Sequence, residues 1–256
     1  MRGPDDIMRL RDSRRTWLPA IVCLLVSLGL VRPGPPVRRA LAQNARPVVH
    51  VFLHLDAKSS VVEKTLQQHL SQLSVTVFGR LRDFEERLAA GAPDAVLSIG
   101  PVLRHHGEAV SLQGYRDGKS VEPYLLASIN QPLEGSLAGK TIGVVELLGR
   151  EGTQAYVSDL LKTTGLKIKR VAKVEDLLPL LEFSAADGVL LPGSMLGMLV
   201  ERTRLTIKTR ELPGALADLP AIAVLNPAAR EIIFKSFQGL DAATKQLLGI
   251  DSWRVP

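Results

Sequence analysis

The sequence predicts an α/β fold built as a two-lobed clamp, in which each lobe is a mainly parallel β-sheet flanked by helices. Hydrophobic periodicity gives the order β-α-β-α-β over residues 48–99, and the same order again over 141–191. An extended apolar run follows each unit, at 124–129 and at 221–225, and can carry the chain between lobes. Alternating strands and helices favour parallel sheets covered by helices. The two halves share no residue-level similarity, so the repeat is one of architecture.

The first unit has clear strand and helix patterns. Strands are expected at 48–55, 75–78 and 95–99, and helices at 61–73 and 81–90. Ser59 or Ser60 can cap the first helix. Residues 102–123 show no regular pattern, so no element is predicted there.

The second unit begins with a strand, a loop and a helix over residues 139–161. The expected strands are 141–145, 167–171, 187–191 and one around 206–207; the expected helices are 154–162, 174–183, 194–202, 228–237 and 241–248. Thr153 can cap the first of these helices. Because the N–H groups at a helix start are free, the region of Gly152 is predicted to hold an anion or a polar ligand head.

The sequence lacks the motifs of common hydrolases, nucleotide-binding proteins and metal sites. It has no G-x-S-x-G, no H-E-x-x-H, no P-loop and no cysteine outside residues 1–42. His105 and His106 have no acidic or cysteine partner at ligand spacing. Glu146 and Asp187 are interpreted as strand-end residues rather than as a catalytic pair. We therefore expect a protein that is not an enzyme and that uses no cofactor and no metal.

Residues 1–42 have the features of an export signal. Arginines precede an apolar run of 15 residues, 17–31, which is short for a membrane span. A small-x-small sequence ends at Ala42, where cleavage is expected, and a periplasmic or otherwise exported location follows. Arg14 and Arg15 resemble a twin-arginine signal. A general secretory signal and an uncleaved anchor are the alternatives.

Most of the net charge of +6 lies in this segment, since residues 1–42 hold eight arginines and three aspartates. The rest of the chain is nearly neutral, with 24 basic and 23 acidic residues. The high pI is therefore no argument for nucleic-acid binding. The single cysteine, Cys23, also lies in this segment, so the mature part can form no internal disulfide.

Four stretches of the chain carry a family resemblance. They are DAVLSIGP at 94–101, SLAGKTIGVV at 136–145, AADGVLLP at 185–192 and the tail from 219 to 253. The chain resembles periplasmic solute-binding proteins of the phosphonate/phosphite/phosphate class, which serve ABC-type importers and have the type 2 periplasmic-binding fold. The resemblance implies one lobe at 46–128 plus 221–256, a second lobe at 129–220, and a ligand in the cleft between them.

The helix starts and the matching stretches together suggest which residues contact the ligand. They are Ser59, Ser60, Ser98, Gly100, Arg104, Gly152, Thr153 and Gln154. Helix starts from both lobes would add their dipoles toward a small polar or anionic ligand, and Arg104 would supply a counter-charge. The expected partners are this small molecule and a membrane permease, and the protein is expected to be a monomer.

An alternative is a ligand-free sensory or interaction protein that keeps the same fold. An enclosed polar cleft would favour the solute-binding interpretation. A cleft filled by Arg104, Leu147, Leu148 or Met195 would favour the alternative.

Overall fold

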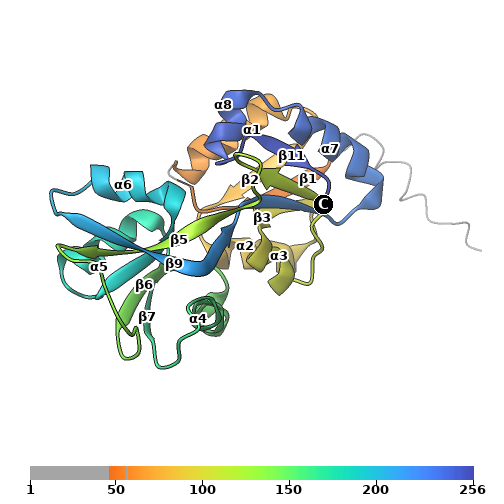
Figure 1. Ribbon diagram of the computed structural model, residues 1–256. Helices are drawn as coiled ribbons and strands as arrows, with labels where there is room; N and C mark the ends of the chain where they lie inside the picture. Colours follow the sequence, from red (N-terminus) through yellow and green to blue (C-terminus); the bar gives the residue numbers. More distant parts are fainter. Residues whose placement is uncertain (1–45, 56) are drawn as a thin grey trace, which may run out of the picture. The chain divides into compact units, whose positions relative to one another are not determined.

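The computed structural model describes residues 46–55 and 57–256, and there the chain forms two separate mixed β-sheets (Figure 1). Two sheets, in place of one continuous sheet, confirm the predicted two-lobed α/β fold. The predicted export signal, its cleavage site and Cys23 lie outside the described residues. Within the described part of the chain, no helix is long and apolar enough to cross a membrane.

The first sheet has six strands in the order β11-β4-β10-β3-β1-β2. Their bounds are β1 Val48–Phe52, β2 Ser74–Phe78, β3 Ala95–Ile99, β4 Leu112–Tyr115, β10 Pro220–Val224 and β11 Ser252–Arg254. Strand β1 pairs in parallel with β2 and β3, as predicted, whereas β10 is antiparallel to β3 and β4. The C-terminal part of the chain therefore completes the sheet of the first lobe.

Helices cover both faces of the first sheet (Figure 1). They are α1 Ser59–His69, α2 Leu81–Ala90, α3 Gly100–His105, α7 Arg230–Gln238, preceded by the 3-10 turn η5 Pro227–Ala229, and α8 Ala242–Leu247. Val51 packs with Leu66 of α1 and Phe237 of α7, whereas its neighbour Phe52 packs on the opposite face, stacked on Phe84 of α2 at a ring distance of 5.2 Å. This alternation follows from the two-residue period of a strand. Each such fully buried side chain contributes roughly 1.5–3 kcal/mol.

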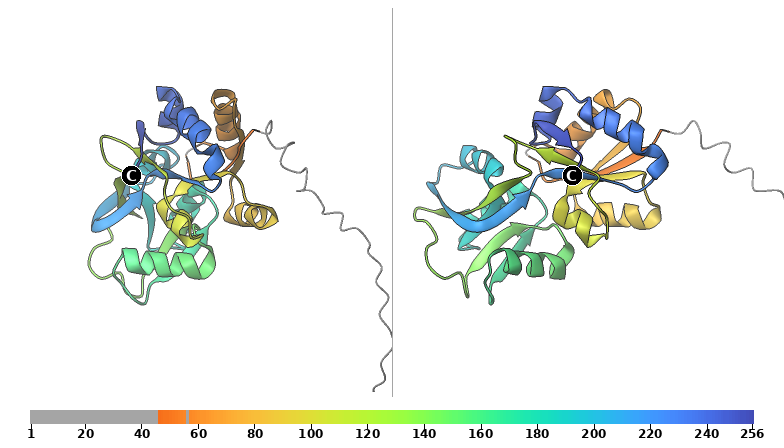
Figure 2. Two further views of the ribbon diagram at one scale, coloured as in Figure 1. Left: turned by 90° about the vertical axis from the view of Figure 1, so that its right-hand side faces the viewer. Right: turned by 45° about the vertical axis from the view of Figure 1, so that its right-hand side comes forward.

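The second sheet has five strands in the order β7-β6-β8-β5-β9. Their bounds are β5 Val121–Ile129, β6 Thr141–Val145, β7 Lys167–Val171, β8 Gly188–Pro192 and β9 Ile207–Asp218. One face packs against α4 Gly149–Leu160 and the other against α5 Leu177–Glu182 and α6 Leu196–Glu201 (Figure 2). Short 3-10 turns, η3 Val174–Asp176 and η4 Gly193–Met195, precede α5 and α6. A Cβ at Gly143 of β6 would lie 2.7 Å from Cδ1 of Leu180, so a larger residue fits under α5 only if this side chain shifts.

The chain crosses between the sheets at two neighbouring points. One crossing lies between β4 and β5, and in the other β9 continues through Leu219 into β10. The N–H of Leu219 donates to the carbonyl oxygen of Ser120 at 2.9 Å, so the crossings are hydrogen-bonded to each other. Strand β5 pairs with β8 and β9 and thus belongs to the second sheet. The predicted boundary after residue 128 and the crossing predicted at 124–129 therefore lie too late in the chain, because Leu126 and Ala127 are buried in the cores of the second lobe.

Several local features differ from the sequence prediction. Helix α3 and strands β4 and β11 occur where no element was expected. The helix predicted over 174–183 is divided into η3 and α5. Pro179 lies in the first turn of α5, where its missing N–H has no helical partner to lose.

Candidate functional site

A cavity of about 80 Å³ lies between the two lobes, and its wall is mainly apolar. Residues of both lobes line it, among them Phe52, Ile99, Val102, Val145, Leu147, Leu190, Met195 and Ala217. Strands β1, β3, β6 and β8 all end at or beside this wall. The cavity therefore lies beyond the carboxyl ends of strands, where open α/β sheets hold their ligands.

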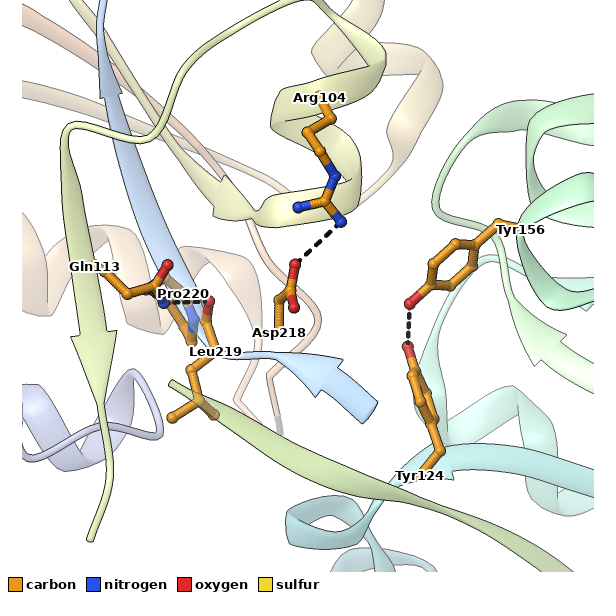
Figure 3. Close-up of polar contacts among 7 residues, drawn as sticks. All are labelled: Arg104, Gln113, Tyr124, Tyr156, Asp218, Leu219 and Pro220. Carbon is orange, nitrogen blue, oxygen red and sulfur yellow. Dashed lines mark hydrogen bonds and ion pairs between the residues drawn. The ribbon is translucent and has the colours of Figure 1, made fainter. Parts of the chain in front are cut away.

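Two tyrosines place hydroxyl groups in the wall of this cavity. Tyr124 of β5 and Tyr156 of α4 have hydroxyl oxygens 3.5 Å apart (Figure 3). Burial raises the pKa of Tyr124 well above its ordinary value and also raises the pKa of Tyr156. Both phenols therefore stay protonated at neutral pH and can donate or accept a hydrogen bond.

An ion pair between Arg104 and Asp218 lies beside the tyrosines (Figure 3). Nη2 of Arg104, on α3, is 3.2 Å from Oδ2 of Asp218, the last residue of β9. The carboxylate lies directly against the backbone of Gly100, since a Cβ there would collide with Oδ2 of Asp218. The arginine predicted to meet an anionic ligand is thus already paired within the protein, and Gly100 is the residue that makes the close approach of the carboxylate sterically allowed.

His54 lies at the boundary of the lobes, just after β1. Burial lowers the pKa of His54 from 6.5 to about 4, although a hydrogen bond with the backbone of Ala172 and the charge of Glu175 act in the opposite direction. The imidazole is therefore neutral at pH 7. Its Nε2 is buried without a hydrogen-bond partner in the described structure. Because Ala172 belongs to the second lobe, His54 joins the two lobes.

A second cavity, of about 340 Å³, also has His54 in its wall and is more polar. Ser59 and Ser60, at the start of α1, line it together with Lys173 and Glu175 of the second lobe. Both predicted serines therefore reach the boundary between the lobes. None of residues 149–154 lines this cavity, so the predicted site is not assembled as one pocket.

Ser98, predicted as a ligand residue, has a partner inside the first lobe. Its side chain is fully buried, and Oγ donates to the carbonyl oxygen of Phe52 at 2.6 Å. The hydroxyl therefore ties β3 to the end of β1, next to the cavity but not in its wall.

Helix α4 begins at Gly149, so the helix start predicted at Gly152–Gln154 is wrong. Gly149 has a φ of +68°, which glycine adopts without strain, and this turn starts the helix earlier than the apolar pattern indicates. Gly152 lies inside the first helical turns. A Cβ there would be 3.7 Å from Cε1 of His105, so this part of α4 faces α3 of the first lobe.

The side chains of Thr153 and Gln154 have partners within the second lobe. Oγ1 of the buried Thr153 accepts from the N–H groups of Leu147 and Leu148, at 3.3 and 3.1 Å. Nε2 of Gln154 is 3.5 Å from the carbonyl oxygen of Leu166. The hydroxyl of Thr153 therefore fixes the loop before α4.

The loop fixed by Thr153 packs across the boundary of the lobes. Leu147 and Leu148 lie against a cluster of the first lobe that contains Phe52, Phe84 and Leu103. Leu147 also lines the small cavity, as does Met195. Leu147, Leu148 and Met195 are three of the four residues that were suggested from the sequence to fill the cleft, and they help to close it.

The polar residues of the cavity were not predicted from the sequence. Tyr124 lies on a strand interpreted only as a crossing, Tyr156 on an ordinary amphipathic helix, and Asp218 at the end of a strand whose length was not predicted. One sequence signal could have drawn attention to these residues. The chain is poor in aromatic residues and has only three tyrosines, and two of them lie at this site together with an aspartate. A group of three or more His, Cys, Asp or Glu side chains placed to hold a metal ion is not found among the described residues.

Comparisons with known proteins identify the fold. No family model matches the sequence, and no curated protein matches it. The VFT2 domain of Bordetella pertussis BvgS is similar over 85% of this chain and 98% of its own, with a TM-score of 0.54 and 15% identity. The chain thus has the two-lobed fold of type 2 periplasmic-binding, or Venus flytrap, domains.

Two further structures share this fold. The ligand-binding core of GluR0 from Nostoc punctiforme, in complex with L-glutamate, is 14% identical, with a TM-score of 0.55 over 79% of this chain and 97% of that one. A Salmonella typhimurium periplasmic binding protein with high arginine specificity is 15% identical, with a TM-score of 0.56 over 79% and 98% of the two chains. At these identities the likeness concerns the fold.

Proposed function

We propose that this chain is an exported solute-binding protein that encloses one small, largely apolar ligand between its lobes. The observation that carries the proposal is the cavity of about 80 Å³ lined by both lobes. Because an apolar cavity of roughly 150 Å³ is the size that holds benzene, this space fits a molecule of only a few non-hydrogen atoms. The hydroxyls of Tyr124 and Tyr156 can bind one polar group of that ligand.

The charges at the cavity support a ligand without net negative charge. Asp218 lines the wall, His54 is neutral, and Arg104 is paired with Asp218. An anion in this space would lose its hydration and gain no free cationic side chain from the wall, which is costly. The polar or anionic ligand predicted from the helix starts is therefore replaced by a small apolar molecule with one polar group.

The importer proposed from the sequence remains the expected setting. The substrate-binding protein of an amino acid ABC transporter shares the fold, at a TM-score of 0.51 and 14% identity over 78% of this chain. We propose a monomer that delivers its ligand to a membrane permease.

A thermal-shift screen tests the ligand. Small neutral alcohols and amides are compared with phosphate, phosphonates and amino acids. A ligand at a hundredfold excess over its dissociation constant adds about 2.7 kcal/mol of stability, which raises Tm by roughly 5–10 °C for a protein of this size. Ala217→Leu fills the cavity and should abolish the shift, whereas Ala155→Leu, at an exposed position of α4, should preserve it. Shifts with anions alone would refute the proposed ligand class.

A ligand-free interaction protein is the second candidate, and the packing of Leu147 and Leu148 on the first lobe favours it. In that case the lobes stay closed without ligand. Small-angle scattering of the purified protein would show one compact form, and the screen would give no shift. Leu148→Ser should then open the clamp, because it replaces an apolar contact between the lobes with a polar group.

Export can be tested separately. Changing Arg14 and Arg15 together to lysine should block export if the signal is of the twin-arginine type. Normal export of the double variant would leave the general secretory route, and a mature N-terminus far from Gln43 would reject the proposed cleavage site.

A further inference from the structure

We propose that Asp218 is a built-in carboxylate that occupies Arg104 and thereby sets the charge preference of the clamp against anionic ligands. The inference rests on the proposed function, since it concerns what the site between the lobes accepts. It assigns a specificity-determining role to a residue that would otherwise count only as part of an ion pair.

The position of Asp218 is fixed by the backbone on both sides. It ends β9 in register with Val121 of β5, and the next residue, Leu219, donates its N–H to Ser120. The backbone of residue 218 is therefore held at this crossing between the lobes. A side chain on a mobile loop would have no such constraint.

Gly100 shows that the fold accommodates this carboxylate. The backbone at residue 100 comes so close to Oδ2 of Asp218 that a Cβ would collide with it, and the same Cβ would lie 2.8 Å from Nη1 of Arg104. Gly100 has no positive φ that would demand a glycine. The absent side chain therefore makes room for the ion pair itself.

The ion pair is placed to act on a ligand. Asp218 lines the cavity, and its charge reaches both Tyr124 and Tyr156, where it contributes to the raised pKa of each phenol. The side chain of Arg104 is 65% exposed and that of Asp218 is 27% exposed. Asp218 lines the cavity and Arg104 does not, so a carboxylate or phosphate in the cavity would meet the negative charge of Asp218 before it reached Arg104, and the two negative charges would repel each other.

The exposure of the pair also means that it adds little to stability, so it can be changed without unfolding the protein. Asp218→Asn keeps the shape and removes the charge. In this variant Arg104 becomes free, and the site should bind an anion that the unmodified protein rejects. Conversely, Arg104→Gln leaves Asp218 unpaired beside the cavity, and the site should then bind a small cation.

Calorimetric titration with acetate, inorganic phosphate and methylammonium, at constant ionic strength, tests both directions. We expect Asp218→Asn to bind acetate or phosphate at least tenfold more tightly than the unmodified protein, and Arg104→Gln to bind methylammonium at least tenfold more tightly. The double variant should show neither gain. Asp159→Asn, which removes the same charge from an exposed ion pair with Lys162, should behave like the unmodified protein.

The outcomes separate this inference from the proposed function. If neither single variant gains affinity, or if the unmodified protein already binds acetate or phosphate as tightly as Asp218→Asn, the inference is overturned. The neutral-compound screen on the unmodified protein decides the proposed function by itself. If Asp218→Asn does not fold, Arg104→Gln still decides the inference by its affinity for methylammonium.

Discussion

Acidification should destabilise this protein through His54, whose Nε2 is buried at the boundary of the lobes. Its folded-state pKa is about 4, against 6.5 for a solvated imidazole, so the unfolded chain takes up a proton first. The stability that depends on neutral His54 is fully present above pH 6.5 and is lost as the pH falls toward 4. From pH 8 to pH 5 the loss from this residue is about 2 kcal/mol.

Urea denaturation at pH 8, 6.5, 5.5 and 5, followed by circular dichroism, measures this effect. His54→Gln removes the titrating group and keeps a polar side chain of similar reach. The pKa values of His50 and His106 are lowered by burial as well, so acidification also destabilises both proteins through these two residues. The difference in unfolding free energy between the two proteins, measured across pH, isolates the contribution of His54.

Near pH 8 the difference in unfolding free energy between the two proteins should not depend on pH, because His54 is neutral in both the folded and the unfolded chain. At pH 5 that difference should have changed by about 2 kcal/mol in favour of the glutamine variant. Parallel pH profiles for the two proteins would refute the reasoning. They would mean that His54 is solvated, and hence that the lobes are apart in solution.

Two further predictions concern packing. Ser98→Ala should lower stability by about 1 kcal/mol in urea denaturation, because the carbonyl oxygen of Phe52 loses a buried donor, and it should leave ligand affinity unchanged; a loss of affinity at full stability would instead make Ser98 a ligand residue. Gly143→Ala should cost roughly 1–3 kcal/mol, because its Cβ would lie 2.9 Å from Val189, whereas Gly197→Ala, with open space around it, should be neutral or stabilising; equal stabilities for the two glycine variants would contradict the tight packing of β6.

The strands and helices with strong periodicity could be predicted because local pattern and burial agree. Residues 95–99 and 141–145 are buried parallel strands in both the sequence pattern and the structure. Strand β11 could not be predicted in this way, since its three residues are extended only because they pair with β4. The start of α4 was missed because the conformation of Gly149 sets it, and Gly149 follows an apolar pair that itself packs on the other lobe.

The candidate site was harder to predict than the fold. The site was predicted at helix starts, because a helix start can be recognised from the sequence of a single segment. The structure instead brings together residues from strand β5, from two helices in different lobes and from the end of β9: Tyr124, Tyr156, Arg104 and Asp218. Such a meeting depends on tertiary packing. Arg104 was predicted as a ligand residue because of its charge, but no feature of the sequence near it indicated that Asp218 would neutralise it.

The position of β10 has a consequence for synthesis of the chain. It lies between β3 and β4, yet it follows the whole second lobe in the sequence. On the ribosome, the second lobe emerges as one continuous segment from Val121 to Asp218 and can fold while the first sheet still has a central gap. Until Val224 has emerged, β3 presents an open edge that can pair with other chains. Nascent chains are therefore expected to complete the second lobe first, and chains that end before Pro220 should aggregate through the exposed edge of β3.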